Sequence, residues 1–240
     1  MAEIFGLTTV FSFGPGGWGR AMLAAAGMTL AVALTGYAIG GALGVLGAFA
    51  KTAGGTITRG LADAYTSILR GIPDLLVIYL FYFGSGAVLT PLGHLFGASG
   101  FVSMPGFVAG ALAIGIVSGA YQTEVFRGAY RAVAKGEIEA ARAVGMSGPL
   151  MLRRILAPLV LRHAIAGLGN VWQLVLKESA LVSVTGLVEI LRQSQIGAGS
   201  TRQPFTFFLG AAILFLVISS VSEWLSSFAE RHFSRGLRRA

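Results

Sequence analysis

The stretch KGEIEAARAVGMSGPLMLRRILAP, residues 135–158, lies between long apolar runs and is far more polar than they are. Its first half combines strong helix formers with early acidic residues, which suit the positive end of a helix dipole. Gly145 stands where that helix would end, because glycine readily adopts the left-handed conformation found there. Ser147 can cap a second helix with Pro149 in its first turn, and Pro158 is expected to interrupt that helix. The stretch therefore predicts two short helices joined by a tight turn.

The rest of the chain has the composition of a membrane protein. Hydrophobic residues make up 55% of its 240 residues, charged residues only 12%, and the mean hydropathy is +0.75. A soluble domain carries about twice as many charges. About 20 apolar residues cross a bilayer as a helix, and five runs are predicted to do so. The predicted spans are residues 20–50, 60–89, 105–131, 159–185 and 204–228. We expect one all-α polytopic membrane domain over residues 1–240, with a loop at 132–158.

Basic residues fall mainly on one side of these spans. Twelve Lys and Arg residues lie in the loops and tail of that side, against only Arg20, Arg192 and Arg202 on the other. Since cytoplasmic loops carry the excess of basic residues, we expect the N-terminus outside and the polar loop and C-terminal tail in the cytoplasm. The net charge of +8 then reflects topology and contact with membrane lipids, and no nucleic-acid partner is expected. The N-terminal segment lacks a basic region and does not predict a cleaved signal peptide.

Several chemistries are excluded by what the sequence lacks. No cysteine is present, which excludes disulfides and thiol catalysis. His94, His163 and His232 match no metal-ligand spacing, and no bound metal is expected. No GxxxxGK[ST] stretch occurs, so the chain cannot cradle ATP phosphates in a P-loop. Energy for any transport must come from a partner protein or an ion gradient, and no catalytic residue is predicted.

The spacing within residues 135–158 resembles the EAA loop of ABC-importer permeases. The matching positions are Glu139, Ala140, Ala141, Gly145, Ile155 and Pro158. Ala157 stands where the family usually has Leu, an apolar replacement. The resemblance implies a type I importer permease fold in which this loop is a coupling helix that docks in a cleft of the cytoplasmic ATPase.

Four further stretches are similar to the histidine/octopine branch of polar amino acid permeases. They are RGIPDLLVIYLFYFG (70–84), GAYQTEVFRGAYRAVAKGEIEAA (119–141), GLGNVWQLVLKESALVSVTGL (167–187) and STRQPFTFF (200–208). The resemblance implies import of histidine, lysine, arginine, ornithine or an opine across a bacterial inner membrane. It also implies a sister permease in a heterodimer, two copies of an ATPase that uses ATP and Mg, and a periplasmic substrate-binding protein. No cofactor is expected on this chain.

Polar residues within the fourth predicted span are candidates for the substrate pathway, because charges inside a membrane are costly and commonly functional. Asn170, Gln173 and Lys177 share one helix face, and Glu178 lies beside them. These residues either line a water-filled pathway or form a hydrogen-bond network between helices. In the second alternative, Lys177 pairs with Asp74 or with neighbours of Glu178.

The second and third predicted spans also contain charges. Arg70 and Asp74 flank Gly71 and Pro73, which indicates either a kink with free carbonyl groups or an ion pair within one helix. Asp74 is a further pathway candidate. In the third span, Glu124 and Arg127 lie three residues apart and are expected to form a structural pair.

Small residues in the first span predict close helix packing. Gly36, Gly40 and Gly44 form two overlapping GxxxG steps, which allow another helix to approach closely. The partner is either another helix of this chain or a second subunit.

Two other function classes fit a polytopic chain, a secondary carrier and a non-ABC membrane scaffold. A carrier normally has more than five helices or an internal repeat, and it would leave the polar loop without a role. A scaffold would not need the polar face of the fourth span. The sequence therefore favours a permease subunit that is not itself an enzyme.

Overall fold

The computed structural model describes residues 9–97, 99, 100 and 102–233, and all regular structure in these ranges is helical. Five helices are long and apolar enough to cross a membrane. They are α2 (Gly19–Ala53), α4 (Asp74–Leu95), α5 (Gly106–Ala132), the continuous helix Gly148–Thr185 and α10 (Pro204–Phe233). The predicted all-α polytopic fold is confirmed. The basic tail that contains Arg235, Arg238 and Arg239 and the first eight residues lie outside the described ranges.

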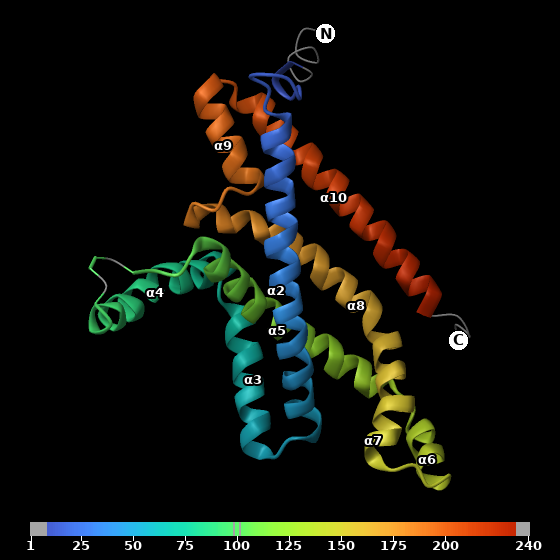
Figure 1. The fold of residues 1–240 in the computed structure, drawn as a ribbon. Coiled ribbons are helices and arrows are strands. Elements are labelled where there is room, and N and C mark those ends of the chain that lie inside the picture. Colours follow the sequence, from blue (N-terminus) through green and yellow to red (C-terminus); the bar gives the residue numbers. More distant parts are fainter. Residues whose placement is uncertain (1–8, 98, 101, 234–240) are drawn as a thin grey trace.

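The helices form a bundle with two distinct ends (Figure 1). Helix α9 (Ile190–Thr201) lies near the start of α2 at one end. Helices α6 (Lys135–Ala143) and α7 (Gly148–Met151) lie at the opposite end, together with the turn from α2 into α3 (Thr56–Gly71). We call these the α9 end and the α6 end. The polar loop therefore occupies one pole of the molecule.

Helices α2 and α5 pack along the three glycines of the first span, all of which are buried. A β-carbon at Gly36 would lie 2.7 Å from Cγ2 of Ile114, and one at Gly40 would collide with Oγ of Ser118. The GxxxG steps are thus filled by a helix of the same chain, which confirms the packing interpretation over that of a subunit seam.

The second predicted span is wrong as a single helix. Helix α3 ends at Gly71, Ile72 is extended with φ −97° and ψ 137°, and α4 begins at Asp74. Proline disfavours the helical conformation of the residue before it, so the chain breaks at Ile72 instead of bending. Arg70 and Asp74 therefore belong to different helices, and the described residues contain no ion pair between them. The 22 residues of α4 alone suffice to span the hydrocarbon layer.

Two further expectations are corrected. Pro158 does not interrupt its helix, because the π-helical segment η1 (Leu152–Leu156) precedes α8 (Ala157–Glu178) and the helical path continues through the 3₁₀ segment η2 (Ser179–Thr185). Proline has no N–H group and cannot donate a backbone hydrogen bond. The wide π turn just before Pro158 shifts the hydrogen-bond register, and the helix continues past the proline. Helix α9 follows, where the sequence predicted only a connection.

Candidate functional site

The polar loop forms the predicted helix and turn. Helix α6 has Glu137 in its first turn and ends at Ala143, with Val144 as its C-cap. Gly145 then adopts φ +77°. Its N–H donates to the carbonyl of Arg142 at 2.9 Å, and the N–H of Met146 donates to the carbonyl of Ala141 at 3.1 Å. These two bonds define a Schellman motif. The left-handed glycine expected from the sequence is confirmed.

The second short helix begins as expected but with a different cap. Ser147 occupies the N-cap position of α7, and its carbonyl oxygen accepts from the N–H of Met151 at 2.9 Å. The side chain of Ser147 makes no capping hydrogen bond within residues 9–97, 99, 100 and 102–233. The position of the helix start is confirmed, and the side-chain cap is wrong.

The six positions that match the EAA loop differ in exposure: some lie on the surface at the α6 end, and others lie nearer the helix bundle. Glu139, Ala140 and Gly145 are exposed at the α6 end, while Ala141 is only 4% exposed. Ile155 is half-buried and Pro158 is exposed on the segments that return toward the bundle. Val144, next to the turn, leaves 73% of its surface exposed. Helix α6 and the C-cap Val144 thus present small, charged and apolar side chains together on an exposed surface.

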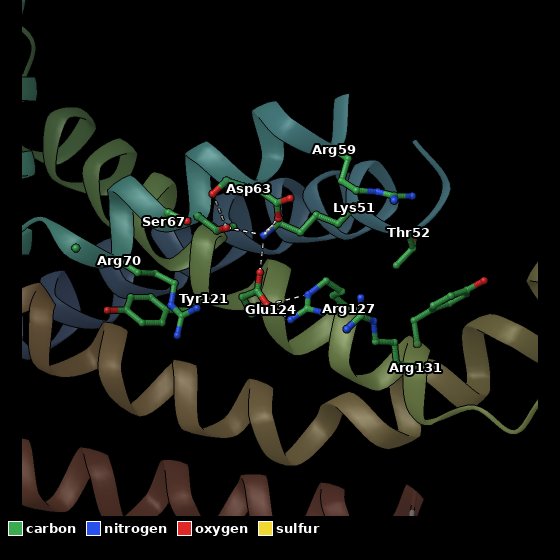
Figure 2. Close-up of a pocket in the computed structure, with 13 residues that line it drawn as sticks. Lys51, Thr52, Arg59, Asp63, Ser67, Arg70, Tyr121, Glu124, Arg127 and Arg131 are labelled. Atoms are coloured by element: carbon green, nitrogen blue, oxygen red, sulfur yellow. Dashed lines mark hydrogen bonds and ion pairs between the residues drawn. The ribbon is translucent and has the colours of Figure 1, made fainter. Parts of the chain in front are cut away.

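A polar cleft of about 810 Å³ opens among α2, α3 and α5 (Figure 2). At its centre lies the side chain of Lys51, which is only 6% exposed. Its ammonium nitrogen lies 2.6 Å from Oε1 of Glu124 and 2.8 Å from Oδ1 of Asp63, and it donates to Oγ1 of Thr66 at 2.6 Å. The sequence assigned Lys51 to a loop and missed this role, because its three partners come from two other helices.

The predicted pair of Glu124 and Arg127 is confirmed and belongs to the same network. Nε of Arg127 donates to Oε2 of Glu124 at 2.8 Å, and its Nη2 reaches the same oxygen. The two cations and two carboxylates of the network cancel. Three other cations line the cleft without an ion pair among the described residues: Arg59, Arg70 and Arg131.

A second group of polar side chains lies near the start of α4. The guanidinium carbon of Arg70 lies 5.4 Å from the ring centroid of Tyr121. Asp74 and Glu178 are both electrostatic neighbours of Tyr121 and of each other. Glu178 is only 6% exposed, and no hydrogen-bond donor among the described residues reaches either of its side-chain oxygens. Burial of a carboxyl group without a hydrogen-bond partner is costly, so Glu178 remains a candidate site residue beside Asp74.

The polar face of α8 does not act as one unit. Gln173 donates to the carbonyl of Ser219 on α10 at 3.1 Å, and to Oε2 of Glu223 at 3.5 Å. Asn170 and Lys177 are exposed. Lys177 has no ion pair or hydrogen bond within the described ranges, so the alternative pairing with Asp74 is not formed. Glu178, one residue further on, points into the chain and is separated from this face.

Glu189 was not singled out from the sequence, although it stands immediately before α9. Its carboxylate accepts from the backbone N–H groups of Leu191 at 2.9 Å and Arg192 at 2.7 Å, which caps the helix. The residue is 0% exposed. Burial raises the pKa of this carboxyl group to about 7, against the two backbone hydrogen bonds, which lower the pKa.

Five membrane-capable helices, an exposed polar loop at one end and buried acids within the bundle are the features of a multi-pass membrane subunit. The model of the family described as binding-protein-dependent transport system inner membrane component matches residues 40–235. The chain belongs to this family of permease subunits.

Several transport permeases match along almost the whole chain. The chain is 57% identical to the octopine transport system permease protein OccQ of Rhizobium meliloti over 234 residues, which cover 98% of this chain and 99% of the relative. It is 47% identical to the nopaline permease NocQ of Agrobacterium fabrum over 96% of this chain and 98% of the relative. It is 36% identical to the histidine/lysine/arginine/ornithine permease HisQ of Escherichia coli, covering 93% and 98%.

Solved structures agree with this assignment. A crystal structure of an amino acid ABC transporter with histidines aligns with a TM-score of 0.76 at 30% identity, covering 90% of this chain and 95% of that one. An inward-facing methionine ABC transporter MetNI aligns with a TM-score of 0.65 at 18% identity, covering 90% and 95%, and shows the shared fold.

Proposed function

We propose that this chain is the membrane subunit through which an ATP-driven importer moves an arginine-derived opine or a basic amino acid. The observation that carries the proposal is the buried carboxyl group of Glu178, which no donor from the described residues reaches and which lies beside Asp74. A guanidinium or ammonium group of the cargo would supply the missing donors, since charge-assisted hydrogen bonds to carboxylates are strong. Arg70, at the edge of the same group, suits a carboxylate of the cargo.

The substrate class follows from this charge pattern together with the relatives. Octopine and nopaline permeases are 57% and 47% identical to this chain. Opines derived from arginine carry a guanidinium group and more than one carboxylate. Two acids with a nearby arginine complement such a molecule better than they complement a simple diamine. Asn170, Gln173 and Lys177 remain secondary pathway candidates, with Gln173 also holding α8 against α10.

Energy enters through the α6 end in this proposal. The exposed face of α6 docks on one of two copies of a cytoplasmic ATPase, which bind ATP and Mg, and this chain contributes no ATP site. A sister permease completes a heterodimer, and a periplasmic binding protein delivers the cargo at the α9 end. The exposed Val144 and Ala140 and the rigid Gly145 turn support the docking role.

The proposed orientation places the α9 end in the periplasm and the α6 end in the cytoplasm. When the buried Lys51 is set aside, eleven of the twelve basic residues that the sequence assigns to the cytoplasmic side still count toward the asymmetry, against three on the other side. Reporter fusions after Gly97 and after the last residue should report opposite sides of the membrane. Equal signals at both positions contradict this orientation.

The test of the cargo site compares Glu178→Gln with Glu230→Gln in the assembled transporter. Glu230 is exposed near the end of α10 and is the matched control. Glu178→Gln should lower ATP-dependent uptake of labelled octopine and arginine about 10- to 100-fold, because one charge-assisted hydrogen bond is worth about 1.5–3 kcal/mol. Assembly with the ATPase should persist. Uptake equal to that of Glu230→Gln would contradict the site.

A further inference from the structure

Two hollows meet at the α6 end of the bundle. One is the polar cleft described above. The other is an apolar groove of about 400 Å³ among α2, α5 and the start of α8, lined by side chains such as Phe49, Phe126 and Leu161. Thr52 and Tyr130 line both hollows. The two spaces therefore adjoin, one polar and one apolar.

The polar side of this junction is cationic. Arg59 and Arg131 line the cleft, are exposed, and have no ion pair among the described residues. Figure 2 shows both on the side of the Lys51 network where Thr52 lies, with Arg70 on the other side. The neutral Lys51 network thus separates them from the proposed cargo site. Two arginines from different helices can bracket a phosphate, whose geometry matches the planar guanidinium fork.

We propose that the junction binds one anionic phospholipid, with its phosphate between Arg59 and Arg131 and an acyl chain in the apolar groove. The groove lies on helices that cross the membrane, at the end where their basic flanks begin. A soluble anion would fill only the polar cleft and leave the groove walls uncovered. An amphiphile fills both spaces, and its negative charge offsets part of the positive charge of the two arginines.

The bound lipid would contact four segments, because the two hollows are lined from α2, α3, α5 and the η1–α8 segment. The η1–α8 segment leads directly from the coupling loop. The site therefore differs in ligand and location from the cargo site, and it does not depend on which cargo is moved.

The test is native mass spectrometry of the delipidated transporter titrated with phosphatidylglycerol or with phosphatidylcholine of the same acyl chains. The test variant, Arg59→Gln/Arg131→Gln, is called the cleft variant. The matched control is Arg153→Gln/Arg231→Gln, which removes the same charge from residues outside both hollows. A second variant, Ala157→Phe, fills the groove without changing the charge. Inorganic phosphate is added as a competitor at constant ionic strength.

The wild type and the control should retain one phosphatidylglycerol per chain and prefer it over phosphatidylcholine. The cleft variant should bind phosphatidylglycerol about 30-fold more weakly, equivalent to about 2 kcal/mol at 1.4 kcal/mol per factor of ten. Ala157→Phe should also weaken lipid binding, whereas the affinity of the polar cleft for inorganic phosphate should stay unchanged.

Three results would overturn the proposal. Equal lipid retention in the cleft variant and the control would show that the arginines do not hold the lipid. Full displacement of the lipid by equimolar inorganic phosphate would identify a soluble-anion site. Unchanged lipid binding with loss of the ATPase in the cleft variant would identify a protein-docking surface. Uptake by the Glu178 variants reports on the cargo site separately, so failure of either proposal is recognisable.

Discussion

The ammonium nitrogen of Lys51, at the end of α2, lies 2.6 Å from Oε1 of Glu124 in the middle of α5. Asp63 joins the same nitrogen from α3 at 2.8 Å. This network holds α3 against α2 and α5. We call the contact of α2 and α5 along Gly36, Gly40 and Gly44 the glycine seam. Since α3 leads directly into the break at Ile72, the network also fixes the place from which α4 departs.

Removal of the lysine should destabilise the bundle. Lys51→Met leaves Glu124 with Arg127 alone and frees Asp63, which is largely exposed. Breaking a fully buried ion pair costs about 3–5 kcal/mol, and partial exposure of Glu124 reduces the expected loss to about 2 kcal/mol. Thermal unfolding of the purified chain measures this loss. The double variant Lys51→Met/Glu124→Gln should recover part of it, and strictly additive losses would show that the two side chains are not coupled.

The glycine seam predicts a second loss of stability. A β-carbon at Gly44 would lie 2.7 Å from Cβ of Gln122 and 3.1 Å from the backbone carbon of that residue. Gly44→Ala should therefore separate α2 from α5 and cost about 1–3 kcal/mol. Gly27→Ala is the control on the same helix, because no atom in the described part of the chain would lie within 4 Å of its β-carbon. If both variants unfold at the same temperature, the seam does not pack as described.

The turn after α6 predicts an effect on coupling. No atom of the described residues would lie within 4 Å of a β-carbon at Gly145, so the cost of a side chain there comes from the positive φ, at about 1–2 kcal/mol. Gly145→Asp adds a charge to the proposed docking surface and should abolish ATP-driven uptake while the chain still inserts. Gly145→Asn, which tolerates this conformation, should retain most uptake. Normal uptake by Gly145→Asp would contradict the proposed coupling role of this loop.

Glu189 predicts a pH dependence at the α9 end. Burial raises its pKa from 4.5 to about 7, so the folded state binds the proton more tightly than the unfolded chain does. The stabilisation is complete below about pH 4.5 and is lost as the pH rises through about 7. The unfolding temperature of the wild type should fall between pH 5 and pH 8, and that of Glu189→Gln should fall less. Glu230→Gln should keep the wild-type slope, and an identical slope in Glu189→Gln would contradict the assignment.

The sequence predicts the membrane class, the number of spans and the turn at Gly145 because each depends on local chemistry. A run of apolar residues, a glycine after a helix and a loop rich in charges carry their own signal. Pro73 restricts the residue before it, so the break at Ile72 could have been predicted. The apolar pattern continues across the break and indicated a single span instead. Helix α9 was missed because it is short and mixed in composition.

The contacts within the side-chain clusters could not be predicted from sequence patterns, because they join residues far apart in the chain. Lys51 meets a partner 73 positions away, and Asp74 meets Glu178 from a different helix. The helical face of α8 suggested that Glu178 acts beside Lys177. Adjacent helical residues point about 100° apart, and that angle sends Glu178 into the chain and Lys177 outward.

Uptake of labelled octopine into proteoliposomes tests the central claim most directly. The vesicles contain this chain with its sister permease and the ATPase, and the binding protein is added outside. We expect accumulation against a gradient only when ATP is enclosed and the binding protein is present, and we expect none in vesicles that lack this chain. Equal uptake without ATP, or uptake driven by an ion gradient instead, would contradict the assignment of this chain as the permease of an ATP-driven importer.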